Sequence, residues 1–60
     1  MKAIIDCHWE SDDKLEVETW ENTEIIIRSV VNGAKVGIAL DKKRVVGLIQ
    51  ILAECLMEID

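Results

Sequence analysis

The residue types best suited to binding chemistry lie on alternating positions of extended segments. His8, Glu16 and Arg28 are predicted to fall in one cross-strand row with Gly37. A histidine beside a carboxylate has a tuned tautomer and pKa, and an arginine can grip a phosphate or a carboxylate. A glycine in that row would let a ligand approach the backbone. The alternative is an ordinary cross-strand charge pair worth up to about 1 kcal/mol, which is the commoner use of such residues.

A second candidate group lies at the start of a predicted helix. Lys42, Lys43 and Arg44 occupy its first turn, where the helix dipole is already positive, and acidic residues occupy its other end. The functional reading is an anion site in which these cations and the free helix N–H groups bind a phosphate. The structural reading is an antiparallel helix pair in a homodimer, where each basic end meets its partner's acidic end. Both readings can hold together.

Trp20 is predicted to share the outer face of the sheet with Ile4 and Glu24, and exposed apolar patches of this kind mark interfaces or ligand sites. A subunit contact is the favoured use, and a stacking platform for a nucleobase is the alternative. Trp9 is predicted to lie on the core face at the end of a strand.

No catalytic motif is present in the chain. A Gly-rich phosphate loop, a CxxC pair and an HExxH motif are all missing. Cys7 and His8 are neighbours on one predicted strand, so their side chains would point to opposite faces. His8, Asp6 and Glu16 do not make a convincing metal site. We therefore expect no enzyme activity, no cofactor and no bound metal.

The elements that position these residues follow from period-two and helical patterns. Asn32-Gly33 predicts a tight type I′ turn and sets the register of its hairpin, with Ile27 opposite Ile38. Asp41 is a good helix N-cap. The chain is thus predicted to be a single α+β domain over residues 1–60, a four-stranded antiparallel meander with one C-terminal helix packed on one face (ββββα). The predicted strands are Lys2–Trp9, Leu15–Trp20, Glu24–Asn32 and Ala34–Leu40, and the predicted helix is Asp41–Ile59.

The predicted helix carries two apolar stripes. One stripe suits the sheet and consists of Val45, Leu48, Leu52, Cys55, Leu56 and Ile59. A second stripe consists of Val46, Ile49, Ala53 and Met57 and would have to be buried by another protein surface. A subunit interface is therefore predicted at these residues, with Ile26 and Val30 from the outer sheet face.

Composition supports an oligomer and excludes several partners. A chain of 60 residues buries only ~60% of its unfolded surface, and it has too few cysteines for a disulfide framework, so oligomerisation is the expected remedy. A net charge of −5 argues against nucleic acid and anionic membranes as partners. No signal peptide or membrane span is expected. A soluble cytoplasmic protein with Cys7 and Cys55 as reduced, buried thiols fits these features.

Two resemblances add expectations. The strand Val36–Leu40 runs into the helix through Leu40-Asp41, which resembles the end of single-stranded-DNA-binding transcriptional coactivators of the positive-cofactor type. Those proteins are dimers with four strands and a helix. In size, acidity and architecture the chain is also similar to small phage proteins that inhibit bacterial defences, some of which are oligomeric sponges for nucleotide signals.

Three functions are therefore expected, in order. The first is a non-enzymatic homo-oligomer, similar to phage anti-defence proteins, that sequesters a small anionic nucleotide-derived ligand at subunit interfaces. Its ligand-binding residues would be Trp20 for stacking, His8 and Glu16 for hydrogen bonding, and Arg28, Lys42, Lys43 and Arg44 for phosphate. The second is an acidic module that inhibits a host protein. The third is a weak ssDNA-binding dimer.

Overall fold

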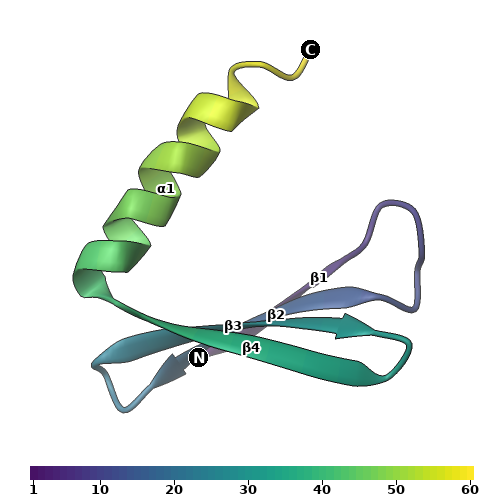
Figure 1. Ribbon diagram of the computed structural model, residues 1–60, viewed down its shortest axis with the longest axis horizontal. Helices are drawn as coiled ribbons and strands as arrows, with labels where there is room; N and C mark the ends of the chain where they lie inside the picture. The colour runs from purple at the N-terminus through teal and green to yellow at the C-terminus, as the bar shows by residue number, and fades with distance from the viewer.

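A computed structural model describes residues 1–60 as four strands followed by one helix. Each strand pairs antiparallel with the next, in the order β1-β2-β3-β4, so the sheet is a meander (Figure 1). This confirms the predicted α+β, ββββα arrangement. The elements are β1 (Lys2–Asp6), β2 (Lys14–Trp20), β3 (Glu24–Val31), β4 (Ala34–Asp41) and α1 (Lys42–Leu56).

The β3–β4 hairpin has the predicted turn and register. Asn32 has φ 52° and Gly33 has φ 80°, so both central residues are left-handed, as a type I′ turn requires. Val31 lies opposite Ala34 and Ile27 lies opposite Ile38, as expected. The turn therefore places Ile27 and Ile38 on the same face.

Strand β1 is shorter than predicted. It ends at Asp6, which pairs with Lys14 at the start of β2. The Cys7 N–H then donates to the Asp13 carbonyl at 2.9 Å and closes a loop. Trp9 lies in this loop and is 87% exposed, so its prediction as a core residue is wrong. The alternating pattern continues past Asp6, but no residue of β2 remains there to pair with it.

Helix α1 begins where β4 ends, with no connecting loop. The Asp41 side chain accepts a hydrogen bond from the Arg44 N–H at 3.0 Å, which confirms Asp41 as the N-cap. The helix ends at Leu56 rather than at the predicted Ile59.

The direction of α1 differs from the predicted packing. The helix rises away from the sheet at the end of β4 and does not lie across its face (Figure 1). None of its residues is buried. Because β4 runs directly into α1, the chain has no loop in which to turn back over the sheet. Cys55 is accordingly exposed and Cys7 is half-buried, so the prediction of two buried thiols is wrong.

The inner sheet face, which we define as the face on the helix side, is apolar and open. Only 1 of 60 residues is buried, and it is the carboxylate Glu16 on the opposite, outer face. No hydrophobic side chain is buried. In Figure 1 the helix and the β1–β2 loop rise on the same side of the sheet at its two ends. The inner sheet face carries Ala3, Ile5, Leu15, Val17, Thr19, Ile25, Ile27, Ser29, Val31, Ala34, Val36, Ile38 and Leu40.

Candidate functional site

The outer sheet face has a cluster of charges around Glu16. Glu16 lies on the central strand β2, directly opposite Arg28 on β3. Its Oε1 lies 3.7 Å from Lys2 Nζ and 3.8 Å from Arg28 Nη1, and its Oε2 lies 3.6 Å from Lys35 Nζ. Strands β1, β3 and β4 therefore each place one basic side chain within 4 Å of the Glu16 carboxylate. We call Lys2, Glu16, Glu18, Arg28 and Lys35 the outer charge cluster.

Arg28 is held by a second carboxylate as well. Its Nη2 donates to Glu18 Oε1 at 3.0 Å. A Cβ placed on Gly37 would lie only 3.1 Å from Arg28 Cγ, so the arginine stem occupies the space over this glycine. The predicted row of Glu16, Arg28 and Gly37 is confirmed. The Arg28 side chain fills the space over Gly37, and its guanidinium is paired with carboxylates of the same chain.

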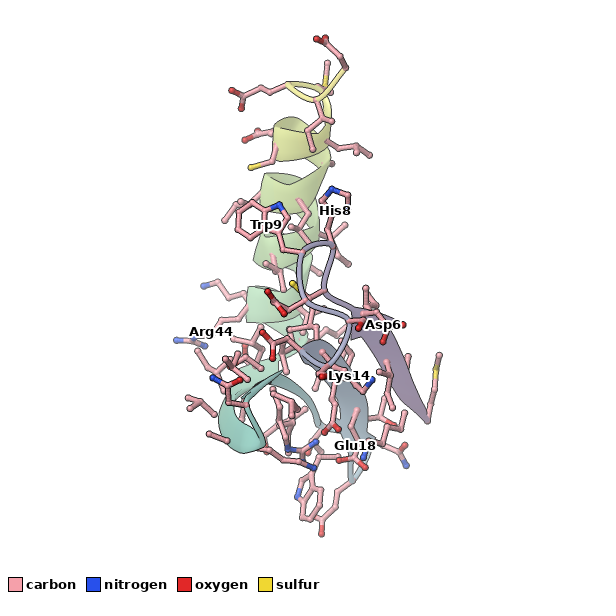
Figure 2. All side chains as sticks on the ribbon, turned by 90° about the vertical axis from the view of Figure 1, so that its right-hand side faces the viewer. Asp6, His8, Trp9, Lys14, Glu18 and Arg44 are labelled. Carbon is pink, nitrogen blue, oxygen red and sulfur yellow. The ribbon has the colours of Figure 1, made fainter.

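His8 does not join this row. The residue opposite Glu16 on β1 is Ile4. The pairing of β1 with β2 ends at Asp6, two residues before His8. Figure 2 shows His8 and Trp9 on the loop at the upper side of the sheet, whereas Glu18 points from its lower side. The predicted pairing of His8 with Glu16 is therefore wrong. Its register depended on the first loop, which is longer than the turn assumed.

Sequence reasoning missed Lys2, Glu18 and Lys35 in the outer charge cluster. Lys2 lies opposite Glu18 and reaches Glu16 along a diagonal, and Lys35 reaches Glu16 past Val30. The available signal was their outward position in the alternation, combined with the length of the lysine side chain. The cluster brings three cations to two carboxylates, and Glu16 Oε1 has no hydrogen-bond partner. It can hold four strands together electrostatically.

At the helix start, one of the three predicted cations is already engaged. Arg44 Nη1 lies 2.9 Å from Asp41 Oδ2. The hydrogen bond from the Arg44 backbone N–H, followed by that from its guanidinium, holds the pKa of Asp41 below the ordinary value of 3.8. Lys42 lines a groove, and Lys43 is exposed. Lys42, Lys43 and Arg44 therefore have different surroundings and do not form one anion site.

The groove beside Lys42 has a volume of about 360 Å³ and lies between the β2–β3 loop and the first turn of α1. Its polar side chains come from the loop and from the ends of the strands. Trp20 does not line it. Trp20 lies opposite Glu24 on the outer face and is 49% exposed. The lining residues are Thr19, Asn22, Thr23, Glu24, Ile25, Leu40, Lys42, Val45 and Val46.

A larger groove of about 530 Å³ lies in the angle between the inner sheet face and α1. We call it the inner groove. Gly47 of α1 is among the residues that line it. The sheet contributes Ile27, Ile38 and Leu40, and the helix contributes Arg44, Gly47, Leu48 and Ile51. Its walls are almost entirely apolar.

The predicted interface residues lie on two separate surfaces. Val46, Ile49, Ala53 and Met57 are all exposed on α1. Ile26 and Val30 are half-buried. They lie on the outer sheet face, because they are one and three positions away from Ile27, which lines the inner groove, and successive strand residues alternate between faces. One flat partner surface could not cover both sets.

Comparison with known proteins leaves the site to be judged on its own geometry. No protein-family model matches the chain, and comparisons with curated proteins and with solved structures found no match. No helix of the structure is long and apolar enough to cross a membrane.

Proposed function

We propose that this chain is a non-enzymatic cytoplasmic binding protein that acts as a homo-oligomer, with the inner groove as its protein-binding surface. One observation carries the proposal, namely that no hydrophobic side chain is buried in the single chain. Burial of apolar surface is the dominant favourable term in folding, so an isolated chain of this shape has little to stabilise it. A second protein surface on the groove would supply the missing core.

The degree of exposure supports this use of the groove. Ile38 on the sheet and Ile51 on the helix both line the groove and are 60% and 58% exposed. Contiguous apolar surface of this kind marks protein interaction sites. The acidic character of the chain, with a net charge of −5, suits an inhibitor that binds a basic host protein once assembled.

A second candidate function is capture of a small anionic ligand, such as a nucleotide. The groove beside Lys42 favours it, because a lysine there meets the polar side chains of Thr19, Asn22 and Thr23. Arg28 and Arg44 are both paired with carboxylates, which leaves Lys42 as the phosphate-binding cation of this site. The resemblance to phage nucleotide sponges supports the same class of ligand.

Native mass spectrometry of the protein purified from cells tests the oligomer and the ligand together. We expect an oligomer, and a monomer at micromolar concentration would overturn the proposed function. Extra mass of nucleotide size, lost on denaturation, would support the second candidate.

Paired lysine variants then locate any bound ligand. Lys42→Ala should remove the extra mass, whereas Lys43→Ala should keep it, because only Lys42 lines the groove. Equal loss in the two variants would assign the binding to general positive charge and contradict the site.

A further inference from the structure

We propose that the inner groove is filled by helix α1 of a second copy of this chain, lying antiparallel to the first. This inference rests on the proposed homo-oligomeric function and names its partner, its geometry and its subunit number. In a two-fold dimer each chain offers the same groove and the same helix, so both grooves are filled at once.

The exposed area of the single chain matches the need of a stable dimer. The chain exposes 5339 Å². A compact monomer of 6.8 kDa is expected to expose about 4,000 Å², so the excess is about 1,400 Å² per chain. Two chains would then hide about 2,800 Å² between them, which falls in the range of roughly 2,000–5,000 Å² for obligate homodimers.

The shape and chemistry of the groove suit a helix. Its walls are a sheet face and a helix that meet at an angle, as Figure 1 shows, and its lining residues on α1 end at Ile51. Gly47 has no atom within 4 Å of the position of a Cβ, so another backbone can approach α1 closely there. An occupant must be elongated and apolar along its length.

Helix α1 of a second copy meets this requirement. Leu52 and Leu56 lie about a quarter turn away from the groove-lining positions on the surface of the helix, and they are 57% and 67% exposed. These two side chains can pack on the inner sheet face of the partner. The groove-lining positions Arg44, Leu48 and Ile51 then form the seam between the two helices, since they recur at helical spacing on one side.

The charges on α1 determine the direction. No acidic residue lies in its first turn and no basic residue in its last turn. The basic end carries Lys42, Lys43 and Arg44, and the acidic end carries Glu54, with Glu58 and Asp60 beyond it. A parallel pair would bring like charges together, whereas an antiparallel pair brings each basic end to an acidic end.

An antiparallel seam makes a specific prediction about neighbours. If Leu48 of one helix lies beside Ile51 of the other, then position 44 lies beside Cys55 of the other. Within one helix these two positions are about 16 Å apart, so they cannot form a disulfide inside a single chain. Cross-linking between positions 44 and 55 therefore reports only contact between two copies.

The test mixes two variants under mild oxidation. The first is Cys7→Ser, which keeps Cys55 as its single thiol. The second is Cys7→Ser, Cys55→Ser, Arg44→Cys, which has its single thiol at position 44. We expect a cross-linked dimer containing one chain of each variant, at least tenfold more abundant than either cross-linked homodimer. Circular dichroism checks that Arg44→Cys keeps the helix after losing its ion pair with Asp41.

Each other outcome has a defined meaning. Cross-linked homodimers without the mixed dimer would show parallel helices and overturn the inference. An oligomer by native mass spectrometry without the mixed cross-link would also overturn it, while leaving the proposed homo-oligomeric function standing. A monomer would overturn both.

A matched pair of helix variants tests the groove by another route. Ile51→Asp puts a charge into the inner groove, whereas Gln50→Asp puts the same charge on an exposed neighbour outside it. We expect dimer dissociation to rise at least a hundredfold for Ile51→Asp and less than about threefold for Gln50→Asp. Equal effects would show that the groove is not the dimer contact and would overturn the inference.

Discussion

Glu16 is the least exposed residue of the chain, yet it is a carboxylate. It tolerates this position because Lys2, Arg28 and Lys35 each lie within 4 Å of one of its oxygens. Those three partners remain 46%, 24% and 57% exposed, so water screens much of their attraction. The cluster thus couples the four strands without the large cost of a fully buried ion pair.

Replacing Glu16 should separate this cluster from an ordinary surface pair. Glu16→Gln keeps the shape and removes the charge, and we expect it to lower the free energy of unfolding by about 1 kcal/mol. Asp6→Asn removes an exposed pair with Lys14 and should cost less than about 0.5 kcal/mol. Urea denaturation at one fixed protein concentration measures both. Equal losses would contradict a central role for Glu16.

The N-cap predicts a dependence on pH at the residue scale. The folded pKa of Asp41 lies below its ordinary value of 3.8, chiefly because the Arg44 N–H donates to its side chain. Ionised Asp41 therefore stabilises the fold above pH 3.8, and this contribution is lost as the pH falls through the lower, folded pKa. Circular dichroism should show acid weakening the helix more in the natural chain than in Asp41→Asn. Asparagine caps a helix without titrating, so an identical acid response would contradict the assignment.

At the scale of elements, the β2–β3 and β3–β4 connections both contain residues with left-handed backbone conformation, but the residue types differ. Gly33 adopts φ 80° without strain, whereas Glu21 adopts φ 49° in the β2–β3 loop with a side chain that disfavours it. Asn22 beside it has φ 59°, which asparagine tolerates. The β2–β3 loop is therefore the more strained connection.

Opposite substitutions should reveal this difference. Gly33→Ala meets no atom within 4 Å, so its cost of roughly 1–2 kcal/mol should come from the positive φ alone. Glu21→Gly relieves the same kind of strain but adds flexibility to the unfolded chain, and we expect a net gain of about 0.5 kcal/mol. Thermal unfolding measures both, and destabilisation by Glu21→Gly would show that the loop is not strained.

At the scale of the whole molecule, stability should depend on protein concentration. A dimer that supplies the core of each chain makes folding and association one equilibrium. A hundredfold dilution should then lower the free energy of unfolding by about 2.7 kcal/mol per dimer. The midpoint of thermal unfolding is expected to fall by several degrees on dilution. A midpoint independent of concentration would mean that each chain is stable alone.

Much of the fold was predictable from the sequence because it depends on neighbours along the chain. The Asn32-Gly33 turn needs positive φ at two adjacent residues, and that turn sets the register of Ile27 against Ile38. The Asp41 cap involves a residue three positions away. These interactions are local, so residue type and spacing were enough to predict them.

The tertiary structure decided the features that depend on distant partners. The alternation continues to Trp9, but β1 ends at Asp6 because pairing requires a neighbouring strand. Lys2 and Lys35 meet Glu16 only after the four strands are assembled. Two apolar stripes on α1 predict two contacts. The spacing of the apolar residues along the sequence is the same whether the helix lies on its own sheet or rises away from it, so the pattern does not predict the direction of the helix. The direct joining of β4 to α1 settles that direction and leaves the inner groove open.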